Sequence, residues 1–375
     1  MSDDLSGLVL SCARAARDTS TDEIRRSASV TADWKRVIET ASEHSLLPLL
    51  AARVGQAGVD IPQPLAEAAA SAAARNLALA AETLRVQDLL TTKGIESIAF
   101  KGPVLSVTLY GTPALRQSTD IDLLVRRRQA LAARRTLQEA GHAFWLDLTP
   151  RQETAFLRYS NEYGLRANDG QIVELSWALA PRHLALALDA DQFFKDACAI
   201  ELGGTRVAVL APHDQLLALA VHGGKHLWER LGWITDVAQL LATTPDLDVD
   251  LALARARSAG AERLVLVAVA MCRVILAAEL QPALSQRIDR DPAVSPLVSN
   301  LRHRLLPLGR RHHERILDPL TLRLRERVRD RATIVARLAG TATVEDWQWA
   351  RLPDALVFAS PAVRPFRLAK KYLFS

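Results

Sequence analysis

The six residues from Asp120 to Val125, DIDLLV, constrain the fold of this chain more than any other stretch. In a β-strand successive side chains point to opposite faces, so Asp120 and Asp122 share one face while Ile121 and Leu123 point to the other. Two carboxylates held side by side are unfavourable unless a cation neutralises them, and such oxygen ligands suit Mg²⁺ or Mn²⁺ better than zinc. The stretch therefore predicts a strand with a divalent-metal site on one face. A solvated strand end is the alternative, because Asp-x-Asp is common by chance.

A later strand offers a third carboxylate. Strands are expected at residues 162–167 and 171–177, because an Asn-Asp-Gly hairpin turn at residues 168–170 separates them. In the second of these strands, apolar neighbours face the core and Glu174 faces the other side. Beside the Asp120 strand, Glu174 could complete a metal site or accept a proton from an attacking hydroxyl. An ordinary exposed strand glutamate is the alternative.

A glycine turn precedes the two aspartates. Apolar periodicity changes from 3.6 to 2 at residues 96–100, which predicts a short strand, and Lys101-Gly102-Pro103 then opens a helix. A glycine lets the backbone approach a ligand closely, and the N–H groups exposed at a helix start favour phosphate oxygens. Pro103 removes one of those donors, so the side chain of Lys101 or Arg116 is expected to carry more of a phosphate contact.

Residues 215–233 predict one helix that places His222, Lys225 and His226 on one face. Two glycines follow His222, and each costs about 1 kcal/mol relative to alanine inside a helix, so a close neighbour is expected there. Histidines four apart also occur on the helix of zinc proteases. Because Gly223 stands where the general-base glutamate would be, we discount metallohydrolysis.

The strands are embedded in helical sequence, so the expected fold class is α+β with a small mixed sheet. We expect an N-terminal helical region at residues 1–95, whose second helix is capped by Thr31 or Asp33. The core sheet is expected at residues 96–210. A larger helical region is expected at residues 211–375.

One N-terminal helix is alanine-rich. It is expected to begin near Pro64 and to stop at Gly94, since its helix propensity is high. A scaffold role is favoured for it, with Arg75 or Asn76 as the residues that could face a ligand.

Bulk composition excludes several classes of protein. The net charge of +5, from 47 basic and 42 acidic side chains, is compatible with a phosphate-bearing ligand but does not require nucleic acid. Three scattered cysteines indicate neither a disulfide framework nor a thiolate metal site, and they favour a reducing cytoplasm. The longest apolar run, residues 264–272, is broken by Arg273 before the roughly 20 residues that a membrane span needs. The acidic start of the chain does not predict a signal peptide.

The motifs together resemble a known family. Lys101-Gly102, Tyr110, Arg116 and the DIDLLV strand are similar to the signature of the bacterial "nucleotidyltransferase family protein" group, in the DNA polymerase beta-like nucleotidyltransferase superfamily. The similarity runs from about Asp33 to beyond Asp236. Two positions depart from the pattern: Pro103 follows the glycine, where relatives have Gly-Gly or Gly-Ser, and Ser176 stands where a histidine is frequent.

The resemblance implies transfer of a nucleoside monophosphate from an NTP to an acceptor hydroxyl with release of pyrophosphate. It implies that two Mg²⁺ or Mn²⁺ ions are held by the carboxylates already named, Asp120, Asp122 and Glu174. It also implies triphosphate contacts from the turn and the following loop (Lys101, Gly102, Arg116, Ser118), and from the helical side (Lys225, His226, Asp236). A core or interhelix salt bridge is an equal alternative for Asp236.

The acceptor stays open at this stage. A peptide, a small molecule and an RNA 3′ end are all compatible with the sequence, with RNA not favoured. The basic stretches at residues 126–135 and 301–331 are interpreted as solvated helix faces, with polyanion binding as the alternative. A different class of function is a catalytically silent nucleotide-binding regulatory or scaffold protein on the same fold.

Overall fold

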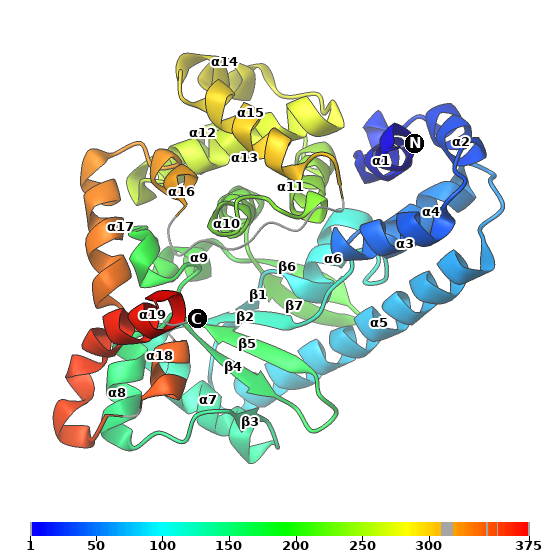
Figure 1. Ribbon diagram of the computed structural model, residues 1–375. Helices are drawn as coiled ribbons and strands as arrows, with labels where there is room; N and C mark the ends of the chain where they lie inside the picture. The colour runs from blue at the N-terminus through cyan, green and yellow to red at the C-terminus, as the bar shows by residue number, and fades with distance from the viewer. Residues whose placement is uncertain (1, 309–317, 343, 351, 374–375) are drawn as a thin grey trace.

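The computed structural model describes residues 2–308, 318–342, 344–350 and 352–373. Within these residues the fold is α+β, as the sequence predicts: a mixed seven-stranded sheet lies between helices from both parts of the chain (Figure 1). The strand order is β3-β4-β5-β2-β1-β7-β6.

The strands are β1 (Ser97–Ala99), β2 (Ile121–Val125), β3 (Ala143–Phe144), β4 (Glu162–Arg166), β5 (Ile172–Ser176), β6 (Cys198–Leu202) and β7 (Thr205–Val209). In the centre, β2 runs parallel to β5 and antiparallel to β1. The predicted hairpin joins the antiparallel strands β4 and β5, and Gly170 in its turn has a φ of 91°. The sequence of β6 did not predict a strand.

The helices before and within the sheet region are α1 (Ser2–Ala13), α2 (Thr21–Ser29), α3 (Trp34–Glu43), α4 (Leu47–Gln56), α5 (Gln63–Thr92), α6 (Gly102–Tyr110), α7 (Ala130–Glu139), α8 (Pro150–Tyr159) and α9 (Ala190–Asp196). Those after the sheet are α10 (Pro212–Lys225), α11 (Leu231–Thr243), α12 (Val249–Ala259), α13 (Glu262–Leu276), α14 (Pro282–Arg290), α15 (Val294–Leu305), α16 (Pro319–Arg323), α17 (Val328–Gly340), α18 (Val344–Trp349) and α19 (Val363–Leu373). Short 3₁₀ segments lie at Ala16–Asp18, Arg127–Gln129, Arg182–Leu184 and Asp354–Ala362.

Two predicted helices are each divided in the structure. Asp33 caps α3, as one of the two expected candidates, by accepting a hydrogen bond from the Arg36 N–H. The helix then ends at Glu43, and Ser45 has a left-handed φ of 59° before α4 begins. Likewise, the single helix expected over residues 215–233 is interrupted between α10 and α11. Apolar periodicity continues across both breaks, so it could not reveal them.

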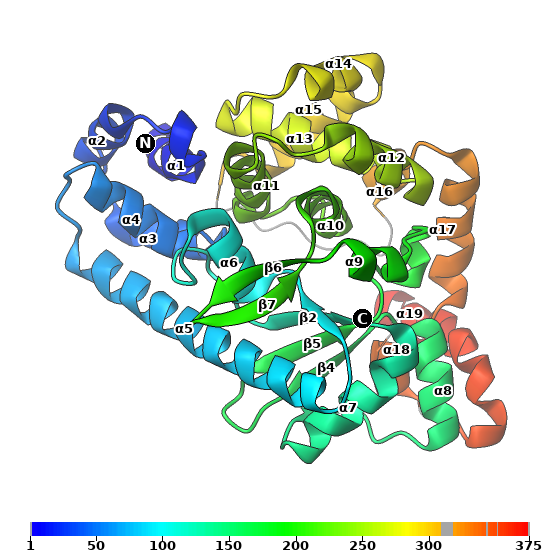
Figure 2. The same cartoon turned by 180° about the vertical axis from the view of Figure 1, so that it is seen from behind.

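The two faces of the sheet have different roles. Ile121 and Leu123 of β2 pack in one apolar cluster with Leu175 of β5 and with α5 and α7. The opposite face carries Asp122 and turns toward α10, with a smaller apolar cluster that includes Leu124 beside it. Figure 2 shows α5 crossing the sheet on one side and α10 on the other. The alternation predicted for β2 is confirmed.

Helices from both ends of the chain share a hydrophobic core. Leu8 of α1 and Leu50 of α4 are fully buried in the same cluster as Leu231 of α11 and Val265 of α13. The first four helices complete the packing of α11. Because α11 packs in turn against α10, they indirectly fix the position of α10, the helix that faces the sheet.

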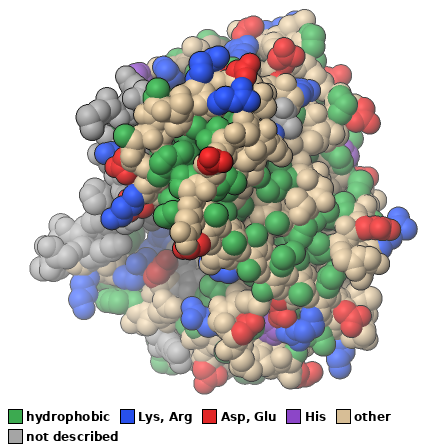
Figure 3. Space-filling view, turned by 90° about the vertical axis from the view of Figure 1, so that its right-hand side faces the viewer, with side chains coloured by type: hydrophobic (Ala, Val, Ile, Leu, Met, Phe, Trp, Pro, Cys, Tyr) green, Lys and Arg blue, Asp and Glu red, His purple; other side chains and the backbone are tan. Residues whose placement is uncertain are grey.

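The surface shows which basic residues are structural. Arg134, expected on a solvated face, is buried and pairs with Glu153 of α8, so that expectation is wrong for this residue. Arg325 is 2% exposed and pairs with Asp330, while residues 309–317 of the same arginine-dense stretch lie outside the described residues. Hydrophobic and charged side chains are interspersed on the face that the N-terminal helices form (Figure 3). No helix among the described residues combines the length and the apolar character that crossing a membrane requires.

Candidate active site

Asp122 and Glu174 lie side by side at the centre of the sheet. The parallel pairing of β2 with β5 places Asp122 directly opposite Glu174, and Asp120 precedes β2 on the same face. Asp122 is 2% exposed, and the ammonium group of Lys101 is the partner of its Oδ1 atom. Three acidic side chains from two neighbouring strands therefore meet on the face that turns toward α10.

Lys101 provides positive charge to this group. Its Nζ atom forms an ion pair with the Asp122 carboxylate, and its side chain passes over the Phe100 ring. Gly102 has a φ of 58°, and a Cβ atom added there would lie 2.9 Å from the carbonyl oxygen of Asp120. Gly102 therefore permits close packing of the turn against the segment that carries the aspartates. It does not line the cavity described below.

The loop between α6 and β2 is fixed by three side chains. Arg116 donates through Nε to both carboxylate oxygens of Asp236, at 3.0 Å each, and through Nη1 to Ser118 Oγ at 3.2 Å. Asn76 of α5, which is fully buried, donates to the carbonyl oxygens of Ala114 at 3.2 Å and Arg116 at 2.7 Å. Its own oxygen accepts from the Ser118 N–H at 3.1 Å. Asp236 therefore forms a salt bridge, but its partner Arg116 lies in this loop and not on another helix.

The break between α10 and α11 explains the two helix glycines. Leu227 and Trp228 have left-handed φ angles of 51° and 48°, which turns the chain back so that the buried Trp228 ring lies on α10. A Cβ atom on Gly223 would lie 2.2 Å from Trp228 Nε1, and one on Gly224 would lie 2.2 Å from Leu264 Cδ2. The expected close neighbours are therefore an indole ring and a leucine of α13.

The α10 face predicted to carry two histidines and a lysine opens toward the carboxylates. The rings of His222 and His226 are 5.4 Å apart between centroids, and each lies about as close to the Trp233 ring, at 5.0 and 5.1 Å. Burial, together with the charges of nearby Lys225 and Lys101, lowers the pKa of His226 to about 4. The imidazole of His226 is thus neutral near neutral pH and can act as a hydrogen-bond partner rather than a cation.

A cavity of about 430 Å³ joins these groups. Its lining includes every predicted site residue except Gly102: Lys101, Arg116, Ser118, Asp120, Asp122, Glu174, Lys225, His226 and Asp236. These residues come from four separate parts of the chain. The cavity therefore lies between the sheet and the helical wall formed by α10 and α11.

The raised pKa values of two carboxyl groups in the cavity reflect their burial and the repulsion between them. Burial raises the pKa of Glu174 to about 8, with further repulsion from Asp122 and Glu162, although Lys101 opposes the shift. Burial and Asp122 also raise the pKa of Asp120. Burial lowers the pKa of Lys101, but the adjacent carboxylates raise it by more, so the ammonium stays charged. A further cation would relieve the remaining repulsion.

The donor set fits a hard divalent cation. Carboxylate oxygens from Asp120, Asp122 and Glu174 are the ligands that Mg²⁺ and Mn²⁺ prefer, and the Lys101 ammonium that pairs with Asp122 Oδ1 leaves part of their mutual repulsion in place. The ligand atoms of these three side chains do not all lie within 4.8 Å of one another. Lys101 instead pairs with Asp122. These residues could hold a metal, with Lys101 as its competitor.

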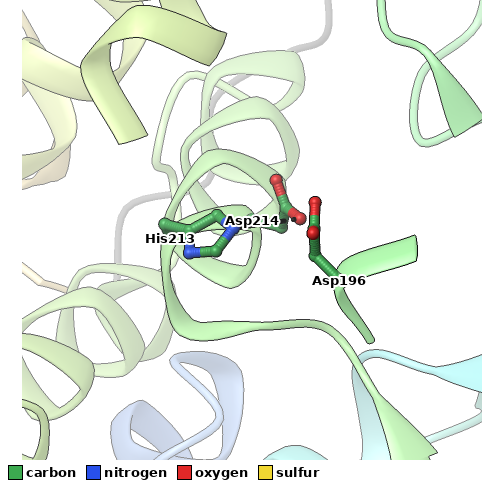
Figure 4. A group of neighbouring side chains, drawn as sticks. All are labelled: Asp196, His213 and Asp214. Atoms are coloured by element: carbon green, nitrogen blue, oxygen red, sulfur yellow. Dashed lines mark ion pairs between the residues drawn. The ribbon is translucent and has the colours of Figure 1, made fainter. Parts of the chain in front are cut away.

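A separate group brings three ligand-type side chains closer together. Asp196, His213 and Asp214 have ligand atoms within 4.8 Å of one another (Figure 4). Arg255 already donates to Asp214 Oδ2 and Asp196 Oδ2, at 2.5 Å each. The guanidinium neutralises both carboxylates, so we interpret the group as a salt-bridge cluster that ties α9 and α10 to α12.

Comparison with known families agrees with the geometry. Residues 31–277 match the model of a family described as "Uncharacterised nucleotidyltransferase". The chain belongs to this family. The matched segment contains all the predicted site residues, and it extends from α3 through α13. The resemblance inferred from the motifs is therefore confirmed at the level of a nucleotidyltransferase family.

Comparisons with solved structures and with curated proteins were also made. A crystal structure of an antigenic nucleotidyltransferase-like protein from Paracoccidioides brasiliensis is similar over 60% of this chain and 91% of that chain, with 14% sequence identity and a TM-score of 0.31. No curated protein matches the chain.

Several cavity residues were not predicted from the sequence. Glu162 lines the cavity from β4, and Arg230 and Trp233 line it from the α10–α11 turn and the first turn of α11. The alternation of β4 could have placed Glu162 on the Glu174 face once the pairing of the two strands was known. The sequence indicates that Asn76 could face a ligand, but in the structure its side chain binds the loop that carries Arg116.

Proposed function

We propose that this protein is a metal-dependent nucleotidyltransferase that transfers an NMP from an NTP to a hydroxyl of an acceptor and releases pyrophosphate. One observation carries the proposal: Asp122 stands in register with Glu174 beside Asp120, on the wall of a cavity that also gathers basic side chains. Membership of a nucleotidyltransferase family supports the same reaction class.

The proposed role of each cavity residue follows from the charge of its side chain. In the proposed reaction the acceptor oxygen forms a bond to the α-phosphorus of the NTP, and the bond from that phosphorus to the bridging oxygen breaks to release pyrophosphate. Lys225 and Arg230 stand on the helical wall of the cavity, where they would bind phosphate oxygens. Glu174 would accept the proton of the attacking hydroxyl, or help to hold the metal.

Asp120, Asp122 and Glu174 would hold Mg²⁺ or Mn²⁺, which supplies charge neutralisation and a lowered hydroxyl pKa when bound. Arg116 is held by Asp236, so its role is to fix the loop and to add positive charge beside Ser118.

Lys101 gives a direct test of the metal assignment. Since its ammonium group pairs with Asp122, a divalent cation must compete with it. We expect Lys101→Met to bind Mn²⁺ at least several-fold more tightly than the wild type in the absence of NTP, measured by electron paramagnetic resonance of free Mn²⁺. Lys93→Met, on an exposed side chain outside the cavity, is the matched control. Weaker Mn²⁺ binding by Lys101→Met would contradict the assignment of Asp122 as a ligand.

The activity is tested by label transfer. The protein is incubated with Mg²⁺, each α-labelled NTP and pools of candidate acceptors, next to an Asp120→Ala/Asp122→Ala variant. We expect transfer and pyrophosphate release by the wild type and loss of both in the variant. An Asp60→Ala/Asp88→Ala variant, which removes two exposed carboxylates away from the cavity, should retain activity. Transfer that survives loss of Asp120 and Asp122 would refute the proposed catalytic centre.

A silent nucleotide-binding protein is the second candidate. The observation in its favour is that the basic groups of Lys101 and Arg116 are both paired with carboxylates of the chain. Saturable NTP binding without pyrophosphate release from any acceptor pool would favour this function over catalysis.

A further inference from the structure

The cavity has opposite charges at its two ends. Lys225, His226 and Arg230 line the helical end, beside α10 and α11, with Glu229 as an acidic neighbour. At the other end, beyond Glu174, the lining consists of Asn161, Glu162 and Ser176 with apolar residues of the segment that follows β5. In the proposed reaction the triphosphate is anionic and belongs at the basic end. The acidic end is then left for the acceptor.

Strand pairing defines the acidic end. Glu162 of β4 lies directly opposite Ser176 of β5, and Gly164 lies opposite Glu174. Directly opposite residues of an antiparallel pair project to the same face, so Glu162 and Ser176 share the face of Glu174. Glu174 and Ser176 are two residues apart, which is about 7 Å along the strand. An acceptor hydroxyl at Glu174 thus places the neighbouring atoms of that acceptor near Ser176 and Glu162.

The polar groups at this end have unused binding capacity. Asn161 Nδ2 donates to Glu162 Oε2 at 2.8 Å, but Glu162 forms no ion pair within the described parts of the chain. Ser176 is 3% exposed and lines the cavity, and its hydroxyl makes no hydrogen bond to any described side chain or backbone group. The Ser176 hydroxyl and the Glu162 oxygen that does not accept from Asn161 can both be satisfied by a ligand that donates hydrogen bonds and carries positive charge.

An aromatic ring borders the same face. Trp145 is 46% exposed, and its ring lies over Gly164, where an added Cβ atom would be 1.9 Å from Trp145 Cη2. Only glycine leaves room for the ring at this position of β4. Trp145 does not itself line the cavity, so it bounds this face of β4 next to the subsite.

We propose that Glu162, Ser176 and Asn161 form the acceptor subsite, and that the acceptor carries an amine close to the hydroxyl that receives the NMP. This inference rests on the proposed function, because the subsite is defined relative to Glu174. It disfavours an RNA 3′ end, because a phosphate near Glu162 would add like-charge repulsion. An amino alcohol, free or as part of a larger molecule, is the chemistry that fits.

The test compares three probes of equal carbon skeleton: serinol, which has an amine, glycerol, which is neutral, and glycerate, which is anionic. Binding to the wild type is measured by calorimetry, with and without Mg²⁺ and a non-hydrolysable NTP. We expect serinol to bind at least tenfold more tightly than glycerol, and glycerate to bind more weakly still. Equal affinities, a preference for glycerate, or no serinol binding in either condition would overturn the inference.

Variants make the charge assignment specific. Glu162→Gln is expected to reduce serinol affinity about tenfold, and Glu162→Lys to reverse the preference toward glycerate. Ser176→Ala should weaken serinol binding by several-fold. Glu201→Lys, at an exposed position of the edge strand β6, makes the same charge change outside the cavity and should leave the preference unaltered. An unchanged preference in Glu162→Lys would overturn the inference.

Nucleotide binding separates this inference from the proposed function. If the wild type binds the NTP and Mg²⁺ but shows no preference for serinol, only the acceptor assignment fails. If serinol binds through Glu162 but no NTP binds, the nucleotidyl transfer proposal fails while the amine subsite stands.

Discussion

Asn76 holds the loop that presents Arg116 and Ser118, so its replacement tests whether this loop is built from outside the cavity. The Asn76→Ala change removes two donors and one acceptor from a fully buried site. It leaves the carbonyl oxygens of Ala114 and Arg116 and the Ser118 N–H without their partner. Each unsatisfied buried group costs about 1 to 3 kcal/mol. Because the loop borders a cavity and can admit water, we take the lower value for each and expect a loss of about 3 kcal/mol.

Thr83 supplies a matched control on the same helix. It is 1% exposed, and its hydroxyl makes a single hydrogen bond, to the Leu79 carbonyl oxygen of its own helix at 2.7 Å. Thr83→Val removes that bond without reaching the loop, so a loss of about 1 kcal/mol or less is expected.

The assay pairs urea unfolding with titration of a fluorescent ATP analogue in the presence of Mg²⁺. We expect Asn76→Ala to lower the free energy of unfolding by about 3 kcal/mol and to weaken nucleotide binding at least tenfold, from the hydrogen bonds lost. Thr83→Val should bind nucleotide like the wild type. If Asn76→Ala and Thr83→Val have equal effects on both measurements, the loop does not depend on Asn76 and the reasoning is refuted.

Three further changes test separate parts of the site. Asp236→Leu leaves the partly buried Arg116 guanidinium without its carboxylate and should lower the free energy of unfolding by about 3 kcal/mol. Adding Arg116→Met should restore part of this loss, and additive losses in urea unfolding would contradict the pairing. Gly223→Ala places a Cβ atom 2.2 Å from Nε1 of the fully buried Trp228 ring. The overpacking cost of about 1 to 3 kcal/mol should exceed the gain of about 1 kcal/mol in helix propensity, so thermal unfolding should occur at a lower temperature. Burial lowers the pKa of His44 from 6.5 to about 4. As the pH falls from 6.5 toward 4, this histidine is protonated in the unfolded chain before it is protonated in the folded protein, so the free energy of unfolding decreases. His44→Gln should remove up to about 3 kcal/mol of this pH dependence, measured by urea unfolding at pH 6.5 and pH 4.

Local patterns in the sequence were sufficient for the strands of the site. The alternation of Asp120 and Asp122 with apolar residues predicts which face of β2 is polar, since side chains on a strand alternate whatever the surroundings. The hairpin before Glu174 is likewise encoded locally by turn residues. The motifs that these elements carry were also enough to identify the family, as its model match confirms.

Helix boundaries were less accessible to prediction. The breaks after Glu43 and after Lys225 leave the apolar spacing intact, and the residues that adopt left-handed angles, Ser45, Leu227 and Trp228, are not glycines. Tertiary contacts stabilise these turns: Trp228 packs on the Gly223 backbone, and the His44 carbonyl oxygen accepts a hydrogen bond from the Gly232 N–H at 3.0 Å. Such contacts join segments that no local pattern connects.

The sequence by itself determined the α+β class, the shared face of Asp120 and Asp122, and the placement of His222, Lys225 and His226 on one side of a helix. These properties follow from the period of a strand or a helix, which depends only on local backbone geometry. The tertiary structure alone decided that Lys101 pairs with Asp122 and that Arg116 is held by Asp236 and Asn76. It also decided that Glu162 and Ser176 face the same cavity, because β4, β5 and the helical wall meet only when the sheet is assembled.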